Sequence, residues 1–235
     1  MRSTQKDAKY FAEQEKYNEE MISTFRAIID EPDTEAAHRQ SLLHAVYRRE
    51  LEQLVTRYSL GGSVPELREH YPRVIDALEA QQQEAGTTAQ DFENFDAYVF
   101  ALWIVSLGIL LDVDIQLLRR AVRELGNLGR DALYDNLLAL KLPGLPRSAD
   151  ILYREPYAPL ADAFCASGAE QTRLMEQFVS EWYEGMRCAY WHNSHLGEDA
   201  GFFGYWCFEL AAIVKMLRID DAEWKSNVFY PGDLV

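Results

Sequence analysis

Cysteine is scarce in this sequence. The chain has three in 235 residues, Cys165, Cys188 and Cys207, and no two of them form a CxxC pair. An odd number leaves one thiol over in any disulfide scheme, and without CxxC spacing the common zinc and redox signatures are missing. We therefore expect a reducing, cytoplasmic environment and a fold stabilised by its apolar core.

Long apolar runs are missing as well. The longest, "YVFALWIVSLGILL" from Tyr98 to Leu111, has 14 residues, fewer than the about 17 to 25 of a membrane-spanning helix. The start of the chain, "MRSTQKDAKYFAEQEKYNEE", lacks the apolar segment and cleavage site of a secretory signal. The sequence predicts no membrane segment and no export by this route. We interpret the apolar run as a buried core helix.

Positive charge is also in short supply. The chain has 23 bases against 38 acids, a net charge of −15. Residues 1–60 hold 9 bases and 11 acids, so most of the excess acid lies in the later two thirds. Such a surface repels phosphate backbones, which disfavours direct nucleic-acid binding, and it attracts a basic partner. Solubility alone is an alternative reason for the same charge.

Strand-like alternation is lacking, whereas helical spacing of apolar residues recurs. Two amphipathic helices are indicated by Tyr10, Tyr17, Met21, Phe25 and Ile28, and then by Leu43, Tyr47, Leu51, Leu54 and Tyr58. The stretch "SLGGSVPEL" predicts a helix end at Gly61 and Gly62, and a new helix capped by Ser63 with Pro65 in its first turn. Further helices are expected over Thr87–Leu111 (capped near Thr88 or Asp91), Asp114–Leu125, Arg130–Leu140 and around Leu174–Met186.

These patterns predict an all-α fold, a single compact multi-helix bundle. Four prolines mark residues 141–168 as a connection between an N-terminal helical region, 1–140, and a C-terminal helical region, 169–235, within one globular unit. A shift of 106 residues places "YVFALWIVSLGILLDVD" over "GYWCFELAAIVKMLRID". Two related helical halves are therefore an alternative to two generic core helices.

The stretch "HNSHLGEDAGFFGYWCFELAAIVKMLRIDD" is the best candidate for chemistry. His192 and His195 have the spacing to share a metal on a helix, with oxygen from Glu198 or Asp199. The alternative is that they end one helix and line the following turn. The HExxH, GxSxG and phosphate-loop signatures are absent. A helical metal-dependent hydrolase stays an alternative, whereas we expect no enzyme, no cofactor and no metal.

One carboxylate falls inside an apolar helix. Glu209 shares its helix with the predicted core stripe Phe203, Trp206, Leu210, Ile213 and Leu217. An unpaired buried carboxylate is costly, so we expect a hydrogen bond from an aromatic hydroxyl, a histidine or an arginine. A general-acid role is the alternative, but no second catalytic group accompanies it. Asp220 and Glu223 have capping-box spacing for a further helix in "RIDDAEWK".

The C-terminal "GYWCFELAAIVKMLRIDDAEWKSNVFYPGDLV" resembles the motif of the PoNi-like bacterial immunity proteins. The matching positions are Gly204, Tyr205, Trp206, Glu209, Ala211, Ala212, Leu217, Ile219, Asp220, Asp221, Tyr230, Pro231, Asp233 and Leu234. The N-terminal helices and "YVFALWIVSLGILLDVD" resemble the companion N-terminal region, so the likeness spans most of the chain. Within the motif we expect a structural role for Tyr205, Trp206, Glu209, Pro231 and Asp233.

The resemblance implies a cytoplasmic, all-helical inhibitor without catalysis of its own. Its partner would be a cognate PoNe-type DNase toxin of contact-dependent or type VI secretion, whose basic DNA-binding cleft an acidic surface can face. Toxin-binding candidates are the acids of the later two thirds: Asp91, Glu93, Asp96, Glu181, Glu184, Glu198, Asp199, Asp220, Asp221 and Glu223. An acidic scaffold for another basic protein is an alternative, and a homo-oligomer stays open.

Overall fold

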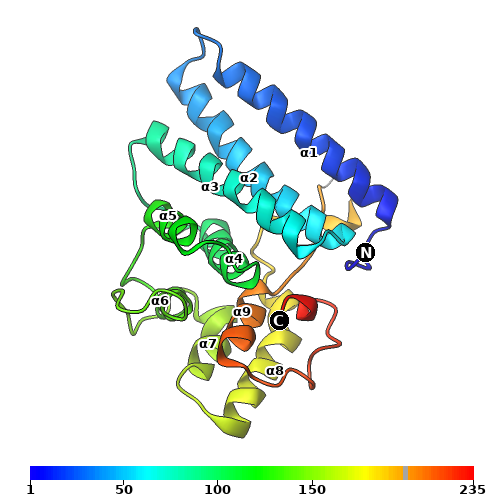
Figure 1. The fold of residues 1–235 in the computed structure, drawn as a ribbon, viewed down its shortest axis with the longest axis vertical. Helices are drawn as coiled ribbons and strands as arrows, with labels where there is room; N and C mark the ends of the chain where they lie inside the picture. The colour runs from blue at the N-terminus through cyan, green and yellow to red at the C-terminus, as the bar shows by residue number, and fades with distance from the viewer. Residues whose placement is uncertain (198–200) are drawn as a thin grey trace. The chain divides into compact units, whose positions relative to one another are not determined.

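The computed structural model describes residues 1–197 and 201–235. Over these ranges the regular elements are α-helices and short 3-10 helices, without a strand (Figure 1), which confirms the all-α prediction. The chain divides into two compact units. Unit 1 comprises Met1–Ala89, Arg119–Leu125 and Asn193–Gly204, and unit 2 comprises Gln90–Leu118, Gly126–His192 and Tyr205–Val235.

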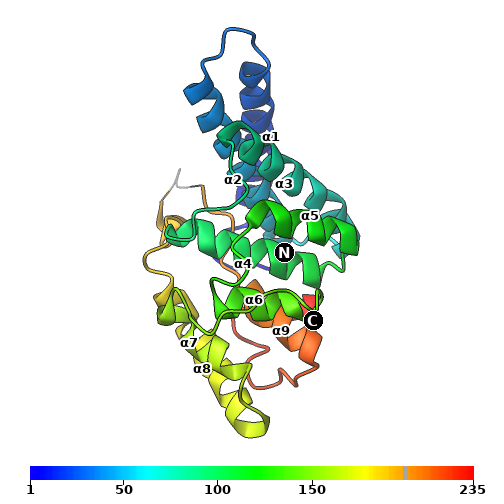
Figure 2. The same ribbon diagram turned by 90° about the vertical axis from the view of Figure 1, so that its left-hand side faces the viewer.

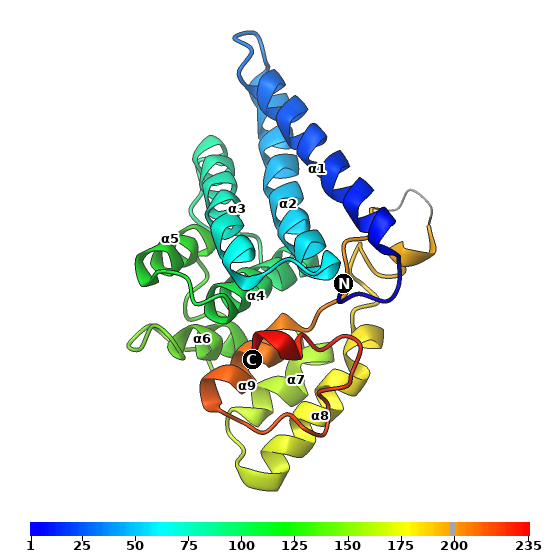
Figure 3. The ribbon, with the colours of Figure 1, turned by 45° about the vertical axis from the view of Figure 1, so that its right-hand side comes forward.

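Unit 1 is built on three long helices, α1 (Ala8–Ile29), α2 (Ala36–Leu60) and α3 (Val64–Ala85). The middle helix, α2, packs against both of the others (Figure 3). Gly61 ends α2 in the left-handed region, with φ of 114°. Ser63 and Glu66 then form a reciprocal capping box, and Pro65 lies in the first turn of α3. These boundaries confirm what the glycine, serine and proline spacing predicted.

The buried face of α1 differs from the predicted stripe. It consists of Phe11, Gln14, Asn18 and Ile22, whereas Tyr17 is 46% exposed. Two of these four residues are amides: Asn18 Oδ1 accepts hydrogen bonds from Gln14 of the same helix at 3.2 Å and from an α2 arginine at 2.9 Å. The contact between α1 and α2 is therefore partly polar.

Two later segments of the chain complete unit 1. The Ser59 hydroxyl donates to the backbone oxygen of Phe203 at 2.7 Å, and the Phe202 ring packs on Phe11 with centroids 5.7 Å apart. The Gln82 amide of α3 donates to the backbone oxygen of Glu124 at 3.1 Å. These contacts join the ends of α1, α2 and α3 to residues far away in sequence.

Unit 2 holds α4 (Phe95–Leu110), the start of α5 (Ile115–Leu125), α6 (Ala132–Ala139), α7 (Arg154–Ala163), α8 (Gly168–Gly185) and α9 (Phe208–Leu217). Helix α4 packs on α9, and α7 on α8 (Figure 2). Every residue from Tyr98 to Leu110 is buried, as the apolar run predicted. Among the helices described, none is long and apolar enough to cross a membrane. The proline-rich segment 141–168 lies inside unit 2 and contains α7.

Two predicted helix starts are wrong. Helix α4 begins at Phe95 rather than near Thr87, because the Asn94 side chain accepts a hydrogen bond from the backbone N–H of Ala97 and caps the helix there. Helix α9 begins at Phe208. The preceding residues are non-helical, with Gly204 at φ of 116° and the Cys207 N–H bonded to the Phe229 oxygen at 2.8 Å.

The sequence after α9 is a series of turns, not the predicted helix. Arg218 ends α9 in the left-handed region, with φ of 56°. The Asp220 side chain accepts from the backbone N–H of Ala222 at 3.1 Å, which stabilises a turn in place of a helix start. Leu217, predicted to lie in the core, is 40% exposed.

Candidate functional site

Three of the predicted toxin-binding acids lie together in unit 2. Asp91, Glu93 and Asp96, which we call the α4 patch, precede or begin α4 and surround Tyr153. The Tyr153 hydroxyl donates to the backbone oxygen of Glu93 at 2.9 Å. Burial, and then the charges of Glu93, Asp91 and Asp96, raise the pKa of Tyr153. The patch is therefore a real concentration of negative charge.

The members of the α4 patch differ in availability. Asp91 and Glu93 are exposed, although Glu93 forms an ion pair with Arg130 at 3.0 Å. Asp96 is half-buried, and its Oδ1 accepts from the backbone N–H of Tyr190 at 3.1 Å. This differs from the expectation of a freely exposed acid. The same bond places Tyr190, 43% exposed, beside the patch.

Five further candidate acids lie in two other parts of unit 2. Glu181 and Glu184 are exposed on α8. Asp220 and Glu223 are exposed in the turns after α9, whereas Asp221 is half-buried and accepts from the Tyr230 hydroxyl at 3.2 Å. Glu198 and Asp199 lie outside the described residues.

Glu209 is fully buried, at 0% exposed. Its Oε1 accepts a hydrogen bond from the indole N–H of Trp182 at 2.8 Å, a donor that was not predicted, and the Tyr157 hydroxyl, a partner of the predicted aromatic kind, also interacts with the carboxyl. Burial raises the pKa of Glu209 to about 7, although its own backbone N–H, Trp182, Tyr157 and Trp103 oppose that rise. The groups that act on it, Trp182, Tyr157 and Trp103, are themselves buried core side chains, which favours a structural role.

The other residues of the predicted structural motif surround α9. Tyr205, Trp206 and Pro231 are buried, and Asp233 is exposed in the 3-10 helix Gly232–Leu234. The ammonium of Lys215 on α9 donates to the backbone oxygens of Leu110 at 2.9 Å and Leu234 at 2.7 Å. The motif region thereby ties the end of α4 to the final turn of the chain.

His192 and His195 do not share a helix, so that predicted geometry is wrong. His192 lies in a turn of unit 2 and stacks on Tyr183 with ring centroids 4.5 Å apart. His195 lies in the 3-10 helix Ser194–Leu196 of unit 1, and its ring forms an edge-type contact with the Phe202 ring, with centroids 6.1 Å apart. Residues 1–197 and 201–235 contain no group of three or more His, Cys, Asp or Glu side chains that could hold a metal. The three cysteines are free.

Unit 1 contains a charged groove that the sequence analysis missed. It consists of two hollows that share Arg57, His70 and Arg73. The Glu66 hollow, of ≈ 500 Å³, is also lined by Glu15, Leu60, Gly62, Glu66 and Glu69. The Gln53 hollow, of ≈ 320 Å³, is also lined by Glu19, Ile22, Ser23, Arg26, Glu50 and Gln53.

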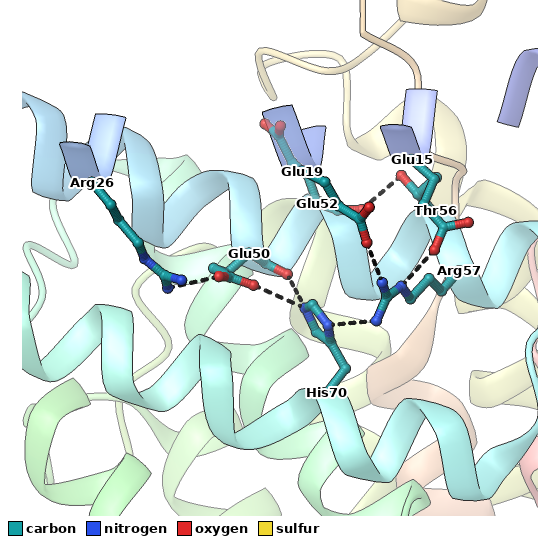
Figure 4. Close-up of polar contacts among 8 residues, drawn as sticks. All are labelled: Glu15, Glu19, Arg26, Glu50, Glu52, Thr56, Arg57 and His70. Atoms are coloured by element: carbon teal, nitrogen blue, oxygen red, sulfur yellow. Dashed lines mark hydrogen bonds and ion pairs between the residues drawn. The ribbon is translucent and has the colours of Figure 1, made fainter. Parts of the chain in front are cut away.

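A chain of ion pairs and hydrogen bonds crosses the groove (Figure 4). Arg57 of α2 donates to Glu15 and Glu19 of α1, each at 2.7 Å, and to Nδ1 of His70 on α3 at 2.9 Å. Because a guanidinium only donates, Nδ1 accepts and the His70 proton is on Nε2. That nitrogen faces Glu50, with its carboxylate at 3.2 Å and its backbone oxygen at 3.0 Å. The network therefore joins all three helices.

Glu50 is the buried acid of this network. Its carboxylate is 2% exposed and pairs with Arg26 at 2.8 Å. Burial acts to raise the pKa of Glu50, but the hydrogen bond from His70 and the charges of Arg26 and Arg73 outweigh it and hold the pKa below its usual value. The available sequence signal was the polar stripe at positions 50, 53 and 57, whose spacings of three and four share a helix face.

The described residues thus present charged surfaces on a helical scaffold. A family model for the N-terminal part of PoNe immunity proteins (PoNi) matches residues 2–123, and one for the C-terminal part matches residues 129–234. The chain belongs to the PoNe immunity protein (PoNi) family, which confirms the resemblance seen in the sequence. Membership implies a toxin-neutralising immunity function.

One solved structure shares the fold along nearly the whole chain. It is described as the crystal structure of protein PA2201 from Pseudomonas aeruginosa, with a TM-score of 0.76 and 18% sequence identity over 99% of this chain and 89% of that chain. At this identity the likeness concerns the all-α fold alone. No curated protein is significantly similar to the chain.

Proposed function

We propose that this chain binds and neutralises a cognate DNase toxin in the cytoplasm, and that the exposed acids of unit 2 face the toxin's basic DNA-binding cleft. The observation that carries the proposal is the match of both PoNi models, which together span nearly the whole chain. The net charge of −15 supports the electrostatic part. The toxin would be one delivered by contact-dependent or type VI secretion.

The physical argument is charge complementarity. A cleft that binds DNA must be basic, and the α4 patch with Glu181, Glu184 and Glu223 offers carboxylates where DNA would offer phosphates. Such charges mainly accelerate association and orient the partner, whereas a buried aromatic anchor adds affinity. Tyr190, 43% exposed beside Asp96, is placed to be such an anchor.

The test compares two triple variants with the same change in charge. One replaces Glu181, Glu184 and Glu223 with lysine. The control replaces Glu31, Asp33 and Glu35, exposed acids around the turn between α1 and α2, with lysine. We expect the first variant to associate with the toxin about tenfold or more slowly at low salt, and the difference to shrink as salt screens the charges. Equal association rates for the two variants would refute the assignment of the surface.

A further inference from the structure

The Gln53 hollow contains a buried amide that the chain itself does not satisfy. Gln53 of α2 is 1% exposed and lines this hollow. Neither its Nε2 nor its Oε1 has a hydrogen-bond partner among the described residues. Buried amides are nearly always hydrogen-bonded, because the loss of water is otherwise uncompensated. The Gln53 amide can therefore form a hydrogen bond with a polar group of a binding partner.

The hollow is rich in arginine although the chain is strongly negative, and Glu15 beside it also pairs with Arg57. Three arginines line it, Arg26, Arg57 and Arg73, against two glutamates, Glu19 and Glu50. Arg26 and Arg57 already hold carboxylates. Arg73 is exposed, and among the described residues it has no hydrogen-bond or ion-pair partner. A longer-range attraction to the charge of Glu50 acts on it. One cation of the hollow is therefore available to an anion.

We propose that the Gln53 hollow receives a carboxylate side chain of the cognate toxin, with the Arg73 guanidinium and the Gln53 Nε2 as its donors. This inference rests on the proposed function. A hydrogen bond between ions is short and about twice as strong as a neutral one. The volume of ≈ 320 Å³ lies at the lower end for ligand pockets, about 300 to 1,000 Å³, which suits one side chain better than a large cofactor.

A carboxylate site gives the interface a specificity that the acidic surface lacks. The exposed acids of unit 2 attract any basic protein. The hollow, in contrast, binds only a partner that presents an acidic side chain within reach of the Arg73 guanidinium and the Gln53 amide. Discrimination of this kind arises from the cost of a misplaced charge. The Gln53 hollow would therefore select the cognate toxin among basic partners.

The sign of the effect at Arg73 identifies the occupant. Toxin affinity is measured by titration calorimetry for the wild type, Arg73→Ala and Arg73→Glu. We expect Arg73→Ala to weaken binding about tenfold or more, and Arg73→Glu to weaken it further by repulsion. The matched control is Arg119→Glu, an exposed arginine of unit 1 that lines neither hollow. Tighter binding by Arg73→Glu would show a basic occupant and overturn the proposal.

The effect at Gln53 separates a partner from solvent. Gln53→Leu keeps nearly the same volume and removes the unsatisfied amide, so we expect an unchanged or higher Tm together with an about tenfold weaker toxin affinity. If water alone fills the hollow, Gln53→Leu will bind the toxin as the wild type does, and the proposal is wrong.

The proposed function and this inference fail in different ways. A wild-type chain that does not bind the toxin refutes the proposed function, and the inference with it. A wild-type chain that binds and protects, while Arg73→Ala, Arg73→Glu and Gln53→Leu bind as tightly as Arg119→Glu, refutes only the carboxylate site. Thermal unfolding of each variant verifies that any loss of affinity comes from a folded protein.

Discussion

Replacement of Glu209 by glutamine should change how stability depends on pH. The carboxyl is 0% exposed, and burial raises its pKa to about 7 from the usual 4.5 of a glutamate. Glutamine keeps the shape and the acceptor for the Trp182 indole, which lies 2.8 Å from Oε1. It removes the ionisable proton. The comparison therefore isolates the titration of one group.

The sign follows from proton linkage. Because the folded pKa is above the unfolded value, the folded state keeps its proton between about pH 4.5 and 7 while the unfolded state releases it. Stability from this group is fully present below pH 4.5 and is lost as the pH rises through 7. For these two pKa values the loss from about pH 5.5 to about pH 8.5 is about 2 kcal/mol.

Urea unfolding at these two pH values measures the effect. Wild type should lose about 2 kcal/mol more than Glu209→Gln when the pH is raised, since all other titrating groups are common to both proteins. At the higher pH the variant should be as stable as the wild type or more stable. The same pH dependence in both proteins would refute the account of a protonated, desolvated carboxyl.

Three further substitutions test the packing of unit 2 by urea unfolding. Asp131→Asn should lower the free energy of unfolding by about 3 kcal/mol, because the buried carboxylate accepts from the Tyr98 hydroxyl at 3.0 Å and from two backbone N–H groups. A loss no larger than that of Asp150→Asn, an exposed control, would contradict this. Gly185→Ala should cost about 1 to 3 kcal/mol, since the new Cβ would lie 2.4 Å from Pro156 Cβ; unchanged stability would show that this contact relaxes freely. Lys215→Met should cost about 1 to 3 kcal/mol and speed proteolysis at the C-terminus, because it leaves two backbone oxygens without their donor; wild-type resistance to protease would argue against the tie.

Local signals predicted much of the helical framework. Gly61, Ser63 and Pro65 mark the junction between α2 and α3 because each acts on its own backbone or that of the next turn. The apolar run from Tyr98 is buried on all sides of α4 because a helix that is apolar all round is stable only when every face is removed from water. Such features depend little on the rest of the fold.

Other features depended on partners far away in sequence. Asn18 is buried because an arginine of α2 donates to it, and Gln14 in turn donates to Asn18, so a search for apolar spacing selected the wrong face of α1. Trp206 is buried although it lies in a non-helical segment before α9. Its apolar character therefore did not reveal where the helix begins. The three-residue spacing from Asp220 to Glu223 fits a capping box, but it occurs here in a turn, so the spacing alone did not distinguish the two.

The groove was missed for the same reason. Arg57, His70 and Glu50 come from two helices and form one network with acids of a third. In the sequence they look like ordinary surface charges. Only the packing of α1 and α3 against α2 makes them neighbours.

The most direct test of immunity is a titration of the toxin's DNA cleavage with this chain. The product of the adjacent gene is tested as the proposed toxin: it is held at a fixed concentration while the chain is added up to and beyond one equivalent, and the rate of DNA cleavage is recorded. The account predicts a complex that co-purifies and a rate that falls to zero at stoichiometric addition. A toxin that neither co-purifies with the chain nor loses activity in its presence would contradict it.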